Sequence, residues 1–264
     1  MSDNGVAVVT GAARGFGLAI AERLIDRDYR VLLADLDADG VHASAERLGP
    51  RASAVLADVR LPGDHAAVAE AAQRLGRLAV WVNNAGVARA GKAWEQTDSE
   101  VTLTIEVNLL GMIFGSRAAV AAMRTHGGHI MNIASMSALG PVPGLAVYAA
   151  SKAGVLNFST SLQGDLKRAR VPIRVHAVCP DAADTALVGG VRGQEDSAIL
   201  FSGNGLLDPG EVADRAVAML QGRRIVAAFP AYRSVLARVG ALAPTLGLAG
   251  LSVMRRLGER RRVR

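Results

Sequence analysis

The sequence predicts an α/β protein, built on a single doubly wound parallel sheet with helices on both faces. Short apolar runs alternate with longer helical segments from the first residues to about residue 229. This alternation is typical of parallel strands joined by crossover helices. No internal repeat or low-complexity linker divides the 264 residues. About seven strands are therefore expected to join one sheet rather than two separate ones.

The strands are expected where a short, mostly apolar run lies between turn residues. A continuous apolar run of this kind indicates a strand that is buried on both faces, as in a parallel sheet. By this criterion the strands fall at residues 5–10, 30–35, 52–57, 78–82, 128–135, 173–178 and 224–229.

The helices are expected between these strands, and several have recognisable starts. Asp37 and Asp98 can each cap the helix that follows them. Asp208, Pro209 and Glu211 supply a cap, a first-turn proline and an acid in the capping-box position. The helices fall at residues 18–28, 39–48, 62–75, 98–123, 146–170 and 208–221.

Two segments do not fit the alternation. Residues 186–207 are rich in glycine and mixed in polarity, and we expect them to form a mobile lid over a substrate pocket. Residues 232–264 follow the last strand, and they are apolar as far as Met254 and basic from Arg255 onward. We therefore divide the chain into a main domain, residues 1–231, and a helical C-terminal extension, residues 232–264.

Composition and charge exclude several classes of protein. Cys179 is the only cysteine, so no intrachain disulfide can form, which is compatible with a reducing cytoplasm. The net charge is +6, but +5 of it lies in the last ten residues, so we expect no nucleic-acid face on the body. The five histidines are scattered without metal-ligand spacing, and no metal site is expected. A strand follows the first residues directly without a signal peptide, and the arginine- and alanine-rich composition suggests a GC-rich bacterial gene.

The segment TGAARGFG, residues 10–17, lies where the first strand turns into the first helix. Glycines at such a turn allow the backbone to approach a pyrophosphate closely. The helix that follows offers free N–H donors and a dipole that favours negative charge. The alternative is an ordinary glycine turn, but the position between a strand and a helix favours a dinucleotide site.

Asp35 ends the second strand, 18 residues after Gly17. A carboxylate at this position can bind the ribose hydroxyls of NAD, and it repels the additional phosphate of NADP. The alternative is that Asp35 only caps the turn after its strand. Arg14 opposes the NAD assignment, because a guanidinium beside the glycines can bind that phosphate. The balance favours NAD over NADP.

Three asparagines occupy positions that suggest a site. Asn83 and Asn84 follow the fourth strand and precede Ala85 and Gly86, and an amide pair before small residues suits close approach of a flat ligand. Asparagine is also an ordinary turn residue. Asn108 lies in the middle of a helix, where asparagine is unfavourable. It either supports an active site through a water molecule or is a satisfied core amide.

Tyr148 and Lys152 are four residues apart, which places them on one face of the helix expected at 146–170. Ser135 ends the strand that precedes this helix. A free tyrosine has a pKa of about 10, and a lysine cation nearby lowers the pKa of the phenol. A phenol, an ammonium and a hydroxyl together suit proton exchange with an alcohol oxygen. In isolation, Tyr148 is more simply a packing residue and Lys152 a solvated charge.

Taken together, these motifs resemble those of the short-chain dehydrogenase/reductase family, in its form of roughly 250 residues. The resemblance covers about residues 5–229 and depends on the order and spacing of the whole set. The set comprises TGAARGFG at 10–17, Asp35, Asp58-Val59, NNAG at 83–86, Asn108, Ser135 and the pair Tyr148 and Lys152. The family implies one Rossmann-type domain and a catalytic group of Asn108, Ser135, Tyr148 and Lys152.

The resemblance also implies a role for each catalytic residue. Tyr148 exchanges a proton with the alcohol or carbonyl oxygen, and Ser135 orients that oxygen. Lys152 holds the nicotinamide ribose and lowers the pKa of the phenol, and Asn108 positions a water molecule that relays protons. Hydride passes directly between the substrate carbon and the nicotinamide.

The cofactor contacts implied by the resemblance extend along the chain. Asp58 and Val59 flank the adenine, Asn84 lies near the ribose, and the Thr185 hydroxyl meets the nicotinamide amide. Asp181 departs from the family, which usually has glycine there, so its carboxylate must turn away or face the substrate. The residues expected to bind cofactor are Thr10, Gly11, Arg14, Gly15, Phe16, Gly17, Asp35, Asp58, Val59, Asn84, Ala85, Gly86, Tyr148, Lys152, Pro180 and Thr185.

The sequence therefore favours a cytoplasmic NAD(P)-dependent oxidoreductase of a secondary alcohol or ketone, forming a homodimer or homotetramer. The alternatives are a catalytically retired regulatory protein and a membrane-surface protein. The extension is a flap over the substrate pocket, a helix on an anionic membrane, an oligomer contact, or a solvated end without a role. An apolar flap would suit a lipophilic, steroid-like or fatty alcohol.

Overall fold

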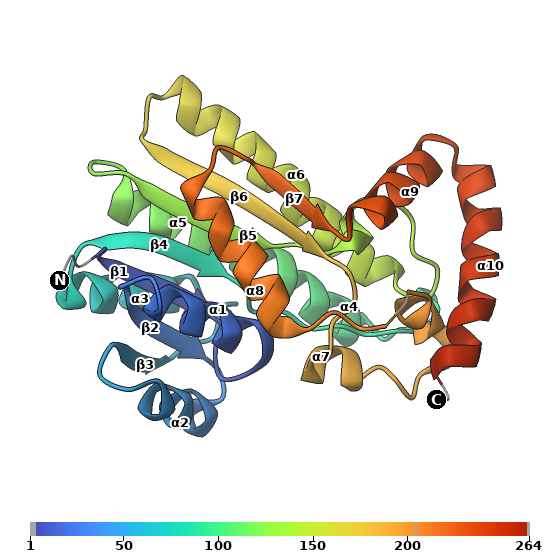
Figure 1. The fold of residues 1–264 in the computed structure, drawn as a ribbon, viewed down its shortest axis with the longest axis horizontal. Helices are drawn as coiled ribbons and strands as arrows, with labels where there is room; N and C mark the ends of the chain where they lie inside the picture. The colour runs from blue at the N-terminus through green and yellow to red at the C-terminus, as the bar shows by residue number, and fades with distance from the viewer. Residues whose placement is uncertain (1–3, 204, 263–264) are drawn as a thin grey trace.

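The computed structural model describes residues 4–203 and 205–262 (Figure 1). Its centre is a seven-stranded sheet in the order β3-β2-β1-β4-β5-β6-β7. Every neighbouring pair of strands is parallel. The order reverses direction between β1 and β4, and such a reversal leaves a crevice at the carboxyl ends of the strands. The predicted doubly wound fold is confirmed.

The elements agree closely with the expected ranges. The strands are β1 (Val6–Thr10), β2 (Arg30–Asp35), β3 (Ala52–Leu56), β4 (Leu78–Asn83), β5 (Gly128–Ile133), β6 (Ile173–Pro180) and β7 (Val226–Phe229). The α-helices are α1 (Gly15–Ile25), α2 (Ala38–Leu48), α3 (Pro62–Leu75), α4 (Asp98–Ile105), α5 (Gly111–Met123), α6 (Ala146–Arg168), α7 (Ala186–Gly189), α8 (Pro209–Ala218), α9 (Ala231–Leu242) and α10 (Pro244–Arg262). Short helical turns are η1 (Glu106–Leu110), η2 (Met136–Ala138), η3 (Glu195–Phe201) and η4 (Met219–Gln221).

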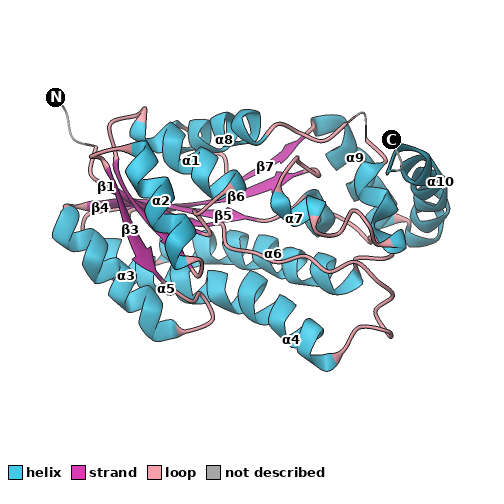
Figure 2. Cartoon of the chain, turned by 90° about the horizontal axis from the view of Figure 1, so that it is seen from below, coloured by secondary structure: helices cyan, strands magenta, loops and turns pink. Residues whose placement is uncertain are grey.

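The core lies on both faces of the sheet, as the continuous apolar strands predict. All five residues of β1 are buried. Ala7 and Val9 pack into the core on one face, whereas Val6 and Val8 pack into the core on the other. Helices α1, α2 and α8 cover the first face, and α3, α5 and α6 cover the second (Figure 2). Both faces must therefore be apolar, which is why the strands show no alternation.

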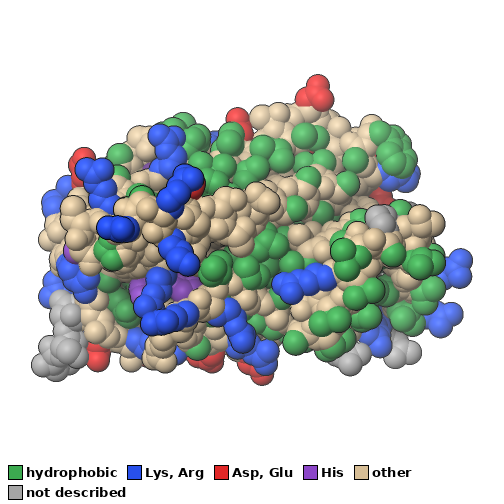
Figure 3. Space-filling view, turned by 90° about the horizontal axis from the view of Figure 1, so that it is seen from above, with side chains coloured by type: hydrophobic (Ala, Val, Ile, Leu, Met, Phe, Trp, Pro, Cys, Tyr) green, Lys and Arg blue, Asp and Glu red, His purple; other side chains and the backbone are tan. Residues whose placement is uncertain are grey.

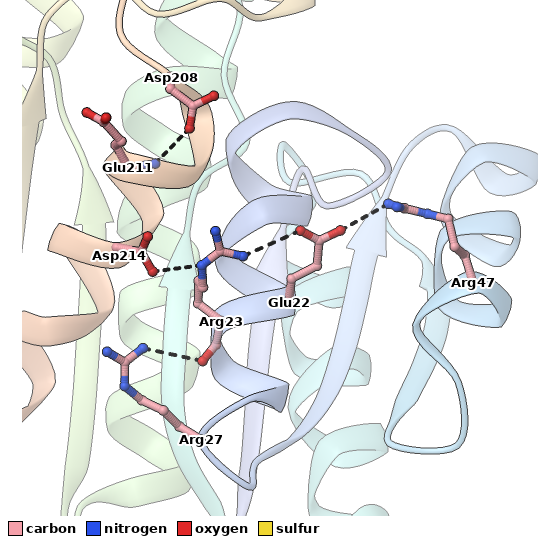
Figure 4. Close-up of polar contacts among 7 residues, drawn as sticks. All are labelled: Glu22, Arg23, Arg27, Arg47, Asp208, Glu211 and Asp214. Carbon is pink, nitrogen blue, oxygen red and sulfur yellow. Dashed lines mark hydrogen bonds and ion pairs between the residues drawn. The ribbon is translucent and has the colours of Figure 1, made fainter.

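Ion pairs tie together the helices of the first face (Figure 4). Arg23 of α1 pairs with Asp214 of α8 at 2.7 Å, and Glu22 pairs with Arg47 of α2 at 3.2 Å. Asp208 caps α8 by accepting a hydrogen bond from the Glu211 backbone N–H at 2.9 Å, as the sequence predicts. These surface contacts fix helix positions and add little stability individually.

Three local expectations were wrong. Helix α1 begins at Gly15, three residues earlier than predicted, so its first turn includes the glycine motif. Thr97 rather than Asp98 caps α4, in a capping box with Glu100. The single long helix expected over 98–123 is interrupted by the π-helical turn η1, which holds Asn108. A π-helical turn is an insertion that helices tolerate mainly at functional sites.

Helices α9 and α10 form a hairpin beside the end of the sheet that carries β7 (Figure 1). Glycines allow unusually close contacts along this hairpin. A Cβ on Gly247 would lie 2.4 Å from the Gly240 carbonyl oxygen, and a Cβ on Gly140 would lie 2.8 Å from the Ala237 carbonyl oxygen. The backbone of α10 also reaches η3, because Gly258 packs directly on the Ala198 carbonyl group. Gly247 and Gly258 are therefore packing surfaces of this hairpin.

Candidate active site

A cleft of about 930 Å³ opens at the carboxyl ends of the strands. It brings together residues that are far apart in the sequence, from the glycine turn at one end to Tyr148 and the lid at the other. Of the predicted site residues, those lining the cleft are Gly11, Arg14, Gly15, Phe16, Asp35, Asp58, Val59, Asn84, Ala85, Gly86, Ser135, Tyr148, Lys152, Pro180 and Thr185. The cleft lining does not include Thr10, Gly17 or Asn108, which instead contact residues that line it.

The glycine turn requires glycine for two different reasons. Gly11 and Gly15 have φ angles of +64° and +60°, in the left-handed region that favours glycine. Gly17 has no space for a side chain, because a Cβ there would lie 2.1 Å from the Gly11 carbonyl oxygen. Arg14, the N-cap of α1, makes no side-chain cap. The first N–H groups of α1 therefore stay available to an anionic group in the cleft.

Asp35 is fixed by two backbone donors at the end of β2. Its carboxylate accepts hydrogen bonds from Ala13 N–H at 2.9 Å and from Asp37 N–H at 3.0 Å. Asp35 thus caps the turn after its strand, which was the alternative to a role in ribose binding, and it also faces the cleft. Arg14 forms an exposed ion pair with Asp37 at 3.3 Å. Two carboxylates and one paired guanidinium give this end of the cleft an acidic character.

Thr10 and Asn84 join the glycine turn to the end of β4. The Asn84 amide donates to the carbonyl oxygens of Thr10 at 3.0 Å and Gly11 at 2.9 Å. The Thr10 hydroxyl accepts from the backbone N–H groups of Asn84 and Ala85. The amide N–H groups of Asn84 therefore shape the turn. Asn84 also forms part of the cleft wall that a ligand would contact.

Asn83 does not form an amide pair with Asn84 at the cleft. Its side chain is buried and points into the core, where it bonds Asn132 at 2.8 Å, Ser116 at 3.1 Å and the Trp81 indole N–H at 2.8 Å. Adjacent residues of a strand point to opposite faces, which explains why only one of the two amides reaches the site. The interpretation of an amide pair for a flat ligand is therefore wrong.

Asp58 and Val59 line the cleft beyond β3. Arg60 grips the Asp58 carboxylate with two nitrogens, at 3.0 Å and 2.5 Å, and this pairing lowers the pKa of Asp58. The Val59 carbonyl oxygen accepts from His65 at 2.8 Å. Both residues are held in place by neighbours that the sequence did not single out.

Ser135 and Tyr148 lie on one wall of the cleft. Ser135 lies two residues after the end of β5 and is the N-cap of η2, and its hydroxyl accepts a hydrogen bond from Ser137 N–H at 3.1 Å. Tyr148 lies in the first turn of α6. Burial raises the pKa of the Tyr148 phenol, and a hydrogen bond with Ser135 partly offsets this. Ser137 also lines the cleft, and its spacing of two residues from Ser135 is the signal that could have identified it.

Lys152 lies one turn after Tyr148 and is only 4% exposed. Its ammonium donates to the Ile133 carbonyl oxygen at 2.9 Å and lies 5.8 Å from the centre of the Tyr148 ring. Burial lowers the pKa of Lys152 to about 8. The sequence predicts that lysine lowers the phenol pKa, but burial dominates and the phenol pKa is raised. The reason is that the ammonium points at a backbone carbonyl rather than at the phenol oxygen.

Asn108 lies behind this group, in the π-helical turn. Its amide donates to the Val87 carbonyl oxygen at 2.9 Å and to the Ser151 hydroxyl at 3.1 Å, and it accepts from Val87 N–H at 2.8 Å. The side chain is thus a satisfied core amide that joins the loop after β4 to α6. Its position is close to Lys152, because a Cβ on Gly86 would meet both Asn108 Oδ1 and Lys152 Nζ.

Asp181, which replaces the usual glycine, turns toward the C-terminal extension. It pairs with Arg233 of α9 at 2.8 Å, and the two side chains are only 15% and 11% exposed. Burial raises the pKa of Asp181, and Arg233 opposes the rise. Arg233 also donates to the Ser202 hydroxyl at 3.1 Å. Sequence reasoning missed Arg233, because its partner lies 52 residues earlier in the chain.

The segment 186–207 covers the other end of the cleft, and contacts hold it at several points. Its base is closed by backbone hydrogen bonds between Leu207 and residues 182 and 184, both at 3.0 Å. Gln194 accepts from Ala90 N–H at 3.0 Å. Arg261 of α10 donates to the Ser202 and Gly203 carbonyl oxygens, and Arg255 faces Asp196 at 3.8 Å. The extension is therefore the outer support of this segment.

These features fit a dinucleotide cofactor. The glycine turn has no room for side chains, the first turn of α1 is uncapped, and a fixed carboxylate stands at the end of β2. Each feature offers what a pyrophosphate or a ribose needs. No group of three or more side chains able to hold a metal ion occurs among the residues that the structure describes.

Comparison with known proteins gives the same result. The family model described as short chain dehydrogenase matches residues 5–196. The chain belongs to the short-chain dehydrogenase family. It is 36% identical to trans-4-hydroxycyclohexanecarboxylate dehydrogenase of Sinomonas cyclohexanicum over 71% of this chain and 75% of that protein.

Two solved structures resemble most of this chain. A short chain dehydrogenase/reductase from Burkholderia phymatum in complex with NAD has a TM-score of 0.85 at 26% identity, covering 94% of this chain and 97% of that one. Actinorhodin polyketide ketoreductase with NADPH has a TM-score of 0.77 at 31% identity, covering 86% and 96%. The chain is thus an NAD(P)-dependent oxidoreductase that acts on alcohol or carbonyl groups of small molecules.

Proposed function

We propose that this short-chain dehydrogenase interconverts a lipophilic secondary alcohol and its ketone, with NAD as the preferred cofactor. The observation that carries the proposal is the meeting of Ser135, Tyr148 and Lys152 on one wall of the cleft that also contains the glycine turn. A retired regulatory protein has no need of this arrangement, so we favour catalysis over that alternative.

Tyr148 is the proposed proton carrier, and Ser135 the group that orients the substrate oxygen. In the oxidation, the alcohol O–H gives its proton to the Tyr148 phenolate oxygen as the carbonyl bond forms. Bound nicotinamide supplies the acceptor for the hydride that leaves the same carbon. Lys152 supplies a positive charge 5.8 Å from the centre of the Tyr148 ring, and its position in the cleft allows it to donate to a ribose hydroxyl. The Asn108 side chain positions the loop after β4. Only the backbone of Asn108 is then left to hold a water molecule that relays protons.

The proposed cofactor orientation follows from the ends of the cleft. The adenosine would lie toward Asp35, Asp58 and Val59, and the pyrophosphate at the start of α1. The nicotinamide would lie toward Tyr148, Pro180 and Thr185. The remaining proposed contacts are the backbone and walls formed by Thr10, Gly11, Arg14, Gly15, Phe16, Gly17, Asn84, Ala85, Gly86 and Lys152.

The preference for NAD rests on the charges around Asp35. The Asp35 carboxylate is held in place by two N–H donors, so it cannot easily turn away from a phosphate. The one cation beside it in the glycine turn, Arg14, is paired with Asp37. A 2′-phosphate would meet two carboxylates before it met a guanidinium.

The lipophilic substrate is proposed from the walls near Tyr148. Leucine and valine side chains from α4, η1, the start of α6, α7 and η3 line the cleft, and the lid and extension cover this end. We propose that residues 1–231 carry cofactor binding and catalysis, while residues 232–264 hold the cover in place. The apolar lining residues near this end are Leu103, Val107, Leu145, Leu187, Val188 and Leu200.

A homodimer or homotetramer, formed through α4, α5 and α6, completes the proposal. The stretch Asp98–Met123 has a mean hydropathy of 1.3 but is only 33% buried. It is the one helix of the described residues that meets the length and composition of a membrane span, which is weak support for spanning because it packs on the sheet. A second copy would cover its outer face. The unpaired thiol of Cys179 suits the reducing cytoplasm.

The experiment is an assay at the NADH absorbance band with a panel of small and bulky secondary alcohols, run with NAD and with NADP. We expect turnover with bulky apolar alcohols and a higher kcat/KM with NAD. Asp35→Ala should weaken NAD binding and reduce the ratio of kcat/KM with NAD to kcat/KM with NADP. The exposed control Asp165→Ala should change neither quantity. Tighter binding of NADPH than NADH to the wild-type chain would overturn the cofactor assignment.

A further inference from the structure

The outer surface of the α9–α10 hairpin is unusually apolar. Fifteen large hydrophobic side chains are exposed among the described residues, and nine of them lie in these two helices. The two most exposed of the nine, Leu242 at 87% and Leu246 at 76%, flank the turn between the helices. Figure 3 shows hydrophobic side chains gathered at this end of the molecule, with basic side chains beside them. Patches of this kind mark sites of interaction.

Helix α9 has its amphipathic character inverted. Its large apolar residues follow helical spacing along one face, and that face points to solvent. Its opposite face, which packs on the protein, carries Arg233, Ser234, Ala237 and Gly240. A helix that served only as a cover would turn the large residues inward. The outward stripe comprises Tyr232, Val235, Leu236, Val239 and Leu242.

Helix α10 continues this pattern and adds charge. Leu246, Val253 and Leu257 are exposed and lie on one face by their spacing. The same face then carries Arg256 and Arg260 toward its C-terminal end, where Arg261 is also exposed. The inner face carries Gly247 and Gly258, which pack on α9 and on the lid. The outer face is thus apolar near the turn and basic at the far end.

The charge around this face is almost entirely positive. Glu259 is the single acidic residue after Asp214, and it pairs with Arg255 at 3.2 Å. An apolar face with a basic flank is complementary to a bilayer that contains anionic lipids. A second copy of this chain is less suitable, because its own outer face offers the arginines no free acidic partner.

We propose that the outer face of α9 and α10 binds the surface of a membrane that contains anionic lipid. The leucines at the turn enter the boundary between headgroups and acyl chains, and the arginines of α10 contact the headgroups. Arg233 on the inner face of α9 and Arg261 at the end of α10 both bond Ser202 of the lid, so the hairpin would lie between a bound membrane and the segment that covers the substrate end. This surface is independent of the proposed reaction.

The test is sedimentation of the full-length protein with vesicles. Vesicles of phosphatidylcholine with phosphatidylglycerol should bind the wild-type chain, and pure phosphatidylcholine should bind it more weakly. The paired variant Leu242→Asp/Leu246→Asp should lose roughly tenfold or more of its binding constant. Arg256→Gln/Arg260→Gln should lose about fivefold per arginine on the anionic vesicles only. High salt should reproduce the arginine effect.

Controls separate docking from folding and from catalysis. Leu61 is 53% exposed and remote from the hairpin, and Leu61→Asp should bind vesicles as the wild type does. Every variant should keep its NADH binding and thermal midpoint. Equal vesicle binding by the paired leucine variant overturns the proposal. A wild-type chain that binds neither kind of vesicle also overturns it. If in that case the paired leucine variant forms a smaller oligomer in solution than the wild type, the face is assigned to contact with a second copy.

Discussion

The two ends of the cleft are built by different means. At the cofactor end, Asp35 and Asn84 bond backbone N–H and carbonyl groups of the glycine turn, and buried strands lie directly behind them. At the substrate end, side chains of the extension hold the cover, through Asp181 with Arg233 and through Arg261. The first end therefore tolerates little change in sequence, whereas the second can change partners without disturbing the sheet.

This difference separates the reaction from its specificity. The groups proposed for proton transfer belong to the rigid end, because β5 and α6 position Ser135, Tyr148 and Lys152. The groups proposed to cover the substrate belong to a segment that is held by residues much later in the chain. Arg261, for example, bonds the Ser202 carbonyl oxygen 59 positions before it. We expect substitutions at the two ends to affect different kinetic constants.

The largest effect is expected for Tyr148→Phe. Loss of the phenol hydroxyl removes the proposed proton carrier, and kcat should fall by about 10³-fold or more. The affinity for NADH, measured by fluorescence titration, should remain within about twofold, because the ring still forms the wall. Turnover close to that of the wild type would show that another group carries the proton.

Gly17→Ala tests the rigid end. Its Cβ would lie 2.1 Å from the Gly11 carbonyl oxygen, so the turn must distort and NADH affinity should fall by roughly 100-fold. Gly164→Ala is the matched control, because that glycine is exposed in α6 and no atom lies within 4 Å of its added Cβ. The control should be stabilised by about 0.5–1 kcal/mol, with unchanged NADH affinity. Equal affinity in both variants would remove the packing argument.

Arg233→Leu tests the cover. It leaves the Asp181 carboxylate buried without a partner, which should cost about 3 kcal/mol of stability. The double variant Asp181→Gly/Arg233→Leu should regain more than half of this loss in denaturant unfolding. KM for a bulky alcohol should rise in the single variant while NADH affinity is preserved. Additive losses in the double variant would contradict the coupling between the two residues.

The pH dependence of that variant has a definite sign. Burial raises the pKa of Asp181 in the folded chain, and Arg233 is the group that opposes the rise. Without Arg233 the folded pKa lies further above the unfolded value, so the folded state binds the proton more tightly. The penalty of Arg233→Leu should therefore shrink as the pH falls through the folded pKa of Asp181.

Lys152→Met is expected to change stability in the opposite direction from Arg233→Leu. Burial lowers the folded pKa of Lys152 to about 8, so the charged form is disfavoured by folding. Removing the charge should stabilise the protein by at most roughly 3 kcal/mol at neutral pH, while turnover is lost. The unfolded chain binds more protons than the folded chain between the folded pKa and the unfolded value. The advantage of the variant should therefore vanish as the pH rises through this window.

Sequence patterns predicted most of the fold because the parallel sheet requires continuous apolar strands. They located every strand to within two residues at each end, as for β6, which extends to Pro180 rather than Val178. They failed where no local sequence pattern indicates the backbone conformation or the direction of a side chain. The π-helical turn around Asn108 and the opposite orientations of Asn83 and Asn84 depend on how neighbouring elements pack.

The candidate site was predictable at its rigid end for a similar reason. Glycines, an acid after a strand, and a tyrosine and lysine one turn apart are local features that the sequence displays. The contacts Asp181 with Arg233 and Ser202 with Arg261 join distant segments, and no local pattern announces them. The sequence also predicted the wrong direction for the pKa shift of the Tyr148 phenol. That direction depends on burial and on where the Lys152 ammonium points.

The central claim is that Tyr148 and a bound nicotinamide address the same substrate carbon. The most direct measurement is a crystal structure of the full chain with NADH. The account predicts the adenosine beside Asp35 and the nicotinamide against the wall formed by Ser135, Tyr148 and Lys152. A nicotinamide ring that lies at the Asp35 end, or that remains out of reach of a substrate held by Tyr148, would contradict it.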